Sequence, residues 1–109
     1  MAITYKTLAQ LNPGATTLTT LYTVPASTSA VCSTLTVCNQ AAAAGTFRVS
    51  VRVAAGADNA KQYLAYDAAI GANSTVALTL GITVAATDLV SVYASAATMS
   101  FNLFGSEIT

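Results

Sequence analysis

Few residues of this 109-residue chain could carry chemistry. Its four acidic residues are Asp58, Asp67, Asp88 and Glu107, and it has no histidine. Without histidine, nucleophilic catalysis of the Ser-His-Asp or Cys-His kind lacks its usual base. A carboxylate pair could still hydrolyse a glycoside. However, Asp58 and Asp88 lie in turn contexts where Asp commonly caps its own backbone, and only Asp67 lies inside an expected strand. We therefore expect no catalytic residue and no enzymatic activity.

The two cysteines do not form a site either. Cys32 and Cys38 fall in one expected strand, which places their Cα atoms about 20 Å apart. That separation exceeds the roughly 7 Å limit for a disulfide and prevents both thiols from binding one zinc ion. Asp58 and Asn59 together offer too few oxygen ligands for calcium. We expect two small buried thiols, no metal and no cofactor.

The clearest structural signal surrounds both arginines of the chain. In Thr46–Val53, apolar side chains at 47, 49, 51 and 53 alternate with polar ones. Side chains of a strand point alternately to its two faces, so this pattern predicts a strand with one buried and one polar face. Arg48 and Arg52 share the polar face, about 13 Å apart.

Two interpretations of these arginines stay open. The simpler one is an ordinary solvated face. In the other, each guanidinium binds a carboxylate or main-chain oxygen of a neighbouring subunit, because its planar donors suit paired oxygens. Asp67 and the C-terminal carboxylate are candidate partners. Ile3 and Tyr5, which share a face of the first expected strand, complete the candidate subunit interface together with Arg48, Arg52 and Asp67.

The rest of the chain also predicts strands. They are Ile3–Leu8, Thr17–Val24, Ser29–Cys38, Lys61–Ile70, Thr75–Ile82, Leu89–Ala94 and Thr98–Phe104, followed by a polar tail at 105–109. We expect Lys61–Ile70 to lead into a hairpin, and the last two strands to form a pair. About eight short strands without a convincing helix predict an all-β, single-domain antiparallel β-sandwich over residues 1–109. A jelly-roll-like arrangement is favoured, with an immunoglobulin-like sandwich as the alternative.

On Ser29–Cys38, strict alternation predicts that Val31 shares a face with Leu35 and Val37, while Cys32 lies on the other face.

Composition restricts the partners. Hydrophobic residues make up 54% of the chain and charged residues 7%, against roughly a quarter charged in typical soluble domains. Zero net charge favours self-association, so we expect a homo-oligomer. Four cations balanced by four anions argue against nucleic acid. No apolar run approaches the roughly 20 residues of a membrane span, so we expect no membrane partner. The start of the chain lacks the pattern of a signal peptide, which predicts cytoplasmic synthesis.

Four runs resemble a known group of proteins. They are Leu21–Ala26 (LYTVPA), Ala30–Asn39 (AVCSTLTVCN), Tyr63–Asp67 (YLAYD) and Phe101–Gly105 (FNLFG). They are similar to small virion structural proteins of tailed bacteriophages, especially cyanophages. The resemblance implies a non-catalytic particle component, located in the virion and assembled in the host cytoplasm.

Our first hypothesis is a capsid decoration (cement) protein, with a trimer favoured, that binds the shell formed by the major capsid protein. A tail, baseplate or fibre-attachment module is the alternative; a receptor-binding tip should show an exposed aromatic cluster such as Tyr63 with Tyr66. A carbohydrate-binding or carbohydrate-acting protein is the second alternative.

Overall fold

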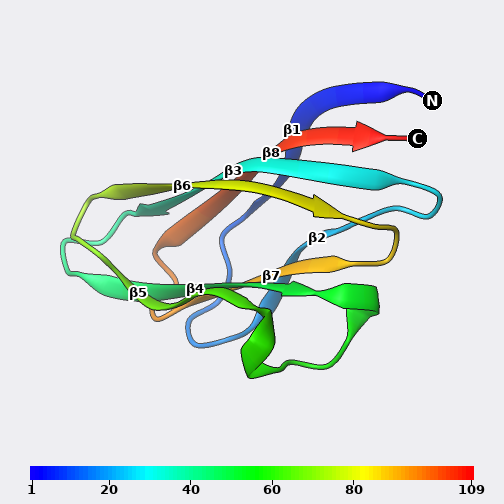
Figure 1. Ribbon diagram of the computed structural model, residues 1–109. Helices are drawn as coiled ribbons and strands as arrows, with labels where there is room; N and C mark the ends of the chain where they lie inside the picture. Colours follow the sequence, from blue (N-terminus) through cyan, green and yellow to red (C-terminus); the bar gives the residue numbers. More distant parts are fainter.

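The computed structural model describes residues 1–109 as eight β-strands with two short 3-10 turns (Figure 1). The strands are β1 (Ile3–Leu11), β2 (Thr19–Thr23), β3 (Ser29–Asn39), β4 (Gly45–Arg52), β5 (Tyr63–Ile70), β6 (Thr75–Val84), β7 (Leu89–Ala94) and β8 (Met99–Ile108). The turns η1 (Val53–Ala55) and η2 (Ala60–Gln62) lie between β4 and β5. No helix has the length and apolar character needed to cross a membrane.

The strands form two packed antiparallel sheets. The first sheet has the order β1-β8-β3-β6 and the second has the order β2-β7-β4-β5. Among consecutive strands, only β4 and β5 are neighbours, because every other connection crosses between the sheets. This is the strand order of an eight-stranded jelly roll, unlike the ABED and CFG sheets of an immunoglobulin domain. The predicted all-β sandwich of jelly-roll type is confirmed.

Both predicted strand pairings near the end of the chain are wrong. The strands β5 and β6 lie in different sheets and so form no hairpin, and the same is true of β7 and β8. The run Gly71-Ala72-Asn73-Ser74, which follows β5, is a typical turn sequence, and the chain does reverse there. A connection that crosses from one sheet to the other reverses the chain as well, so the signal does not distinguish the two cases.

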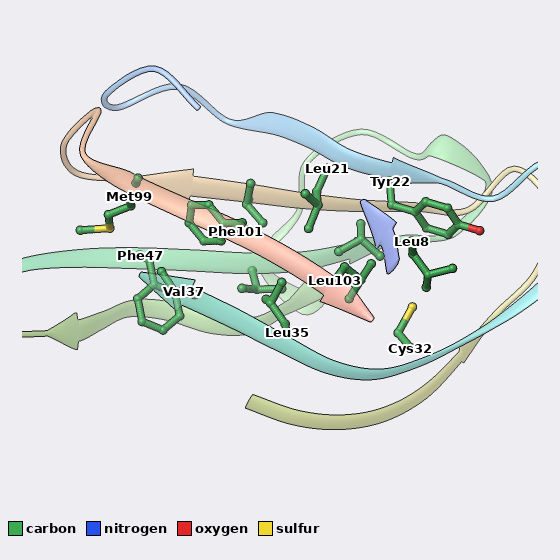
Figure 2. Close-up of a cluster of buried hydrophobic side chains, with 14 of the residues drawn as sticks. Leu8, Leu21, Tyr22, Cys32, Leu35, Val37, Phe47, Met99, Phe101 and Leu103 are labelled. Atoms are coloured by element: carbon green, nitrogen blue, oxygen red, sulfur yellow. The ribbon is translucent and has the colours of Figure 1, made fainter. Parts of the chain in front are cut away.

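The core lies between the sheets (Figure 2). Phe47 of β4 meets Phe101 of β8 edge-on, with ring centroids 6.4 Å apart. Phe47 and Val49 are fully buried, as alternation along this strand predicts. Val53 is the exception. It is 70% exposed, because β4 ends at Arg52 and Val53 begins η1.

A β-bulge changes the expected faces of β3. The register of β3 against both neighbours shifts between Cys32 and Thr34, so alternation is interrupted at this point. Cys32 is consequently buried on the core face together with Leu35, whereas Val31 turns outward. The predicted grouping of Val31 with Leu35 is therefore wrong.

Burial raises the pKa of the Cys32 thiol to about 11. Both cysteines are free, and Cys38 is half-buried.

The two ends of the chain are joined in the first sheet. β8 continues through the expected polar tail to Ile108, which pairs with Ile3 of β1. Beyond this pair, the backbone amide of Ala2 donates to the oxygen of Thr109 at 3.0 Å, and that of Thr109 donates to Ala2 at 2.9 Å. Both termini lie at the same end of the sandwich (Figure 1). The predicted end at Phe104 is wrong, because β1 supplies a partner along the whole tail.

Candidate functional site

A bulge in β5 brings two residues of that strand opposite one residue of β4. Phe47 pairs with Ala68 and Val49 pairs with Ala65, so Tyr66 and Asp67 together face Arg48. Such bulges redirect side chains from their ordinary face. Asp67 takes the left-handed backbone conformation, with φ of 50°, which Asp tolerates better than most residues. The bulge thereby builds a cluster on the outer face of the second sheet.

Arg48 is the centre of this cluster. Its Nε donates to Oδ1 of Asp67 at 2.7 Å, and a terminal nitrogen donates to Oδ2 at 3.3 Å. The guanidinium carbon lies 4.1 Å from the ring centre of Tyr66 and 4.2 Å from that of Tyr93. Tyr93 comes from β7, directly across the ladder from Arg48. The hydrogen bonds to Asp67 raise the pKa of Arg48, so the cluster holds a permanent cation between two aromatic rings.

A third tyrosine, Tyr63, contacts the cluster at Tyr66. The ring of Tyr63 meets that of Tyr66 edge-on, with centroids 5.0 Å apart. The Tyr63 hydroxyl donates to Oδ1 of Asp58 at 2.8 Å. Burial and this bond raise the pKa of Tyr63. A capping box between Asn59 and Gln62 fixes η2, which follows Asp58 in the chain.

A depression opens beside these rings. We call it the tyrosine depression, and its volume is about 540 Å³. It is lined by Arg48, Asp58, Asn59, Ala60, Tyr63 and Tyr66. Tyr66 is 59% exposed. A neighbouring depression of about 630 Å³ shares Asn59 and includes Val53 and Lys61. Figure 1 shows the segment between β4 and β5, which supplies much of both linings, on the side of the second sheet away from the first.

The structure places the predicted arginines on one outer face but gives them partners inside the chain. Arg48 binds Asp67, and Arg52 donates from Nε to the oxygen of Gly56 at 2.7 Å. Within one chain, Arg48 and Arg52 thus each have a partner, and the candidate subunit interface stays a prediction. Asp58 uses its carboxylate on Tyr63 instead of its own backbone. Asp88 does cap its turn, because Oδ2 accepts from the amide of Ala85 at 2.9 Å.

Sequence reasoning missed Tyr93. Tyr93 lies on β7. The alternation of this segment predicts a strand, but it does not indicate which residue of another strand lies opposite Tyr93. Only the pairing of β7 with β4 places it beside Arg48.

Ile3 and Tyr5 lie on the opposite side of the molecule, on the outer face of the first sheet. They share a face as predicted and are 48% and 82% exposed. Cross-strand rows extend this face over β1, β8, β3 and β6, for example the row Thr7–Phe104–Thr34–Thr79. Its further residues are Gln10, Val31, Thr36, Cys38, Thr75, Ala77, Thr83, Ser100, Asn102 and Ser106.

None of these residues is charged, so we call this surface the uncharged face. The two charged residues of the first sheet turn toward the second: Glu107 accepts from the hydroxyl of Tyr22 on β2 at 2.5 Å and pairs with Lys6 at 2.9 Å. Asp88 lies in the turn before β7. The other five charged residues belong to β4, β5 or the segment between them. Every charged side chain thus lies away from the uncharged face.

No known protein family, curated protein or solved structure matches this chain. No group of three His, Cys, Asp or Glu side chains is placed to hold a metal ion. Jelly rolls occur in viral capsid and lectin domains among others, and a fold alone does not determine function. Functional inference therefore rests on the two outer faces.

Proposed function

We propose that this chain is a non-enzymatic virion structural protein, a capsid decoration protein that binds the shell of the major capsid protein through its uncharged face. One observation carries the proposal: the outer face of the first sheet has no charged side chain yet exposes Tyr5 and Ile3. Covering such a face removes weakly polar surface from water without burying an unpaired charge, which is the costly step in association. The resemblance to phage virion proteins supports the same conclusion.

The size of the uncharged face suits a repeated contact. Four strands about 4.8 Å apart, each of roughly ten residues, project to an area on the order of 600 Å². A stable interface buries about 800 Å² on each partner. One copy bound through this face alone is therefore expected to bind modestly, and many copies on a shell supply the remaining strength through avidity. Trimer formation through an adjoining strand edge enlarges the contact further.

A charge placed on the uncharged face tests this proposal. Thr36 lies on β3, a central strand of the first sheet, so Thr36→Lys puts a cation in the middle of the contact. The matched control is Thr20→Lys, at an exposed threonine of the second sheet. The assay is co-sedimentation of each protein with shells assembled from the major capsid protein of the same genome. We expect the wild type and Thr20→Lys to bind and Thr36→Lys to be released.

Failure of the wild type to bind shells would contradict the proposal, and so would equal binding by Thr36→Lys.

A second candidate function is a tail, baseplate or fibre-attachment module. The contact between Tyr63 and the exposed Tyr66 favours it, because an exposed aromatic cluster is the feature expected of a receptor-binding surface. Copy number in purified particles separates the two candidates. Hundreds of copies are expected of a decoration protein and a handful of a tail module.

A further inference from the structure

We propose that the tyrosine depression is a binding site for a neutral saccharide. It lies on the sheet opposite the uncharged face, so the inference does not depend on the proposed shell contact. Tyr66 supplies the platform, because the residue is 59% exposed and an aromatic ring offers an apolar surface on which the C–H face of a sugar packs.

Contacts within the chain hold the Tyr66 ring in place without a ligand. Arg48 lies 4.1 Å from the centre of the Tyr66 ring, and Tyr63 abuts the same ring edge-on at 5.0 Å. The Tyr63 hydroxyl is in turn tied to Asp58. Rings in the core are fixed by packing, but an exposed ring fixed from two sides is preorganised, which lowers the entropy cost of binding.

Hydrogen-bonding groups with spare capacity surround the ring. Asp58 accepts from Tyr63 through Oδ1, which leaves Oδ2 for a sugar hydroxyl. Asn59 accepts through Oδ1 from the amide of Lys61, which leaves its side-chain NH2 as a donor. Arg48 also keeps N–H donors that Asp67 does not use. Sugar hydroxyls both donate and accept, so this mixture of donors and an acceptor matches them.

The charged side chains around the tyrosine depression favour a neutral ligand. Asp67 pairs with Arg48 through two hydrogen bonds, and Asp58, which makes no salt bridge, adds a carboxylate to the lining. An anionic sugar or a nucleotide phosphate would meet that carboxylate. The volume of about 540 Å³ falls within the roughly 300–1,000 Å³ range of small-ligand sites. The neighbouring depression, which shares Asn59, provides room for a longer chain.

The five tyrosines of the chain allow a direct test by NMR of their ring signals, assigned with single Tyr→Phe variants. The neutral probes are maltose, cellobiose, lactose and N,N′-diacetylchitobiose, and the anionic probe is 3′-sialyllactose. We expect at least one neutral disaccharide at millimolar concentration to shift the ring signals of Tyr63 and Tyr66. Those of Tyr5 should stay unchanged, because Tyr5 lies on the other sheet.

Variants then test the assignment. Tyr66→Ala should weaken binding at least about tenfold, as expected for removal of an aromatic anchor, whereas Tyr66→Phe should retain it. Tyr5→Ala is the matched control, because it removes another exposed tyrosine. The inference is overturned if no neutral probe shifts Tyr63 or Tyr66, if Tyr66→Ala binds as well as wild type, or if 3′-sialyllactose binds more tightly than lactose. None of these outcomes bears on shell binding, which Thr36→Lys tests separately.

Discussion

Gly105 is the position at which the fold tolerates a side chain least. It lies on β8 opposite Cys32, next to the bulge of β3. A Cβ atom added to Gly105 would lie 1.9 Å from the carbonyl oxygen of Val31 and 3.2 Å from the Cα of Cys32. Both neighbours are backbone atoms, so no side-chain rotation relieves the contact.

The cost of Gly105→Ala follows from this geometry. Even a tight Cβ contact needs 3.0 Å, so β8 and β3 must separate locally by at least 3.0 − 1.9 = 1.1 Å. Overpacking of this kind costs about 1–3 kcal/mol, and weakening two adjacent ladder hydrogen bonds adds about 1 kcal/mol each. We therefore expect the free energy of unfolding to fall by roughly 3–5 kcal/mol, a large part of the 5–15 kcal/mol of a typical domain.

Urea unfolding followed by far-UV circular dichroism at several protein concentrations measures this change. Two other glycines calibrate it. Gly14→Ala meets nothing within 4 Å and should be neutral or stabilising by up to about 1 kcal/mol. Gly81→Ala also meets nothing, but its φ of 60° should cost about 1–2 kcal/mol. If Gly105→Ala unfolds within about 1 kcal/mol of Gly14→Ala, the close approach of β8 and β3 is refuted.

Three further predictions concern the core, the ion pair between Lys6 and Glu107 and the Arg48 cluster. Phe101→Ala should lower the free energy of unfolding by about 3–5 kcal/mol, measured by the same urea titration. Hydrogen bonds from Tyr22 and then Lys6 lower the pKa of Glu107 from 4.5. Its contribution to stability should therefore be complete above that pH and be lost as the pH falls through the lowered folded value. Thermal unfolding from pH 6 to 2 should show a smaller acid-induced loss in Glu107→Gln. Asp67→Asn should alter the NMR ring shifts of Tyr66; unchanged shifts would contradict the role of Asp67 in holding Arg48.

The positions of the strands were predictable from the sequence, but the faces of a bulged strand were not. The alternation at 46–52 predicts the burial of Phe47 and Val49, because β4 keeps an uninterrupted register with β7. It does not predict that Ser50, on the expected polar face, is fully buried or that Val51 is only half-buried. On β3 the same reasoning fails at Cys32, since the bulge at residue 33 inverts the faces. Neither glycine nor proline marks that bulge, so the local sequence gives no warning. The order of strands in the sheets was also not predictable, because a connection that crosses between the sheets and a hairpin use the same turn residues.

The candidate site was predictable in part. Arg48 and Asp67 stand out by type, but sequence alone does not show that a bulge in β5 makes them partners within one chain. Tyr63 and Tyr66 were candidates for an exposed aromatic cluster, and they do lie in contact. The contribution of Tyr93 depends on the pairing of β7 with β4. The uncharged face likewise appears only when four strands distant in sequence are laid side by side.

The strand order also has a consequence for how the protein is made. The last strand of the sequence, β8, lies between β1 and β3, which leave the ribosome much earlier. The first sheet therefore stays open until synthesis is nearly complete, and the growing chain must keep two early strands from pairing with each other or with another nascent copy. Because most pairings close long loops, we expect refolding in milliseconds to seconds, as for other β-sandwiches. The β4–β5 hairpin, the one local pairing, is the natural place for that process to begin.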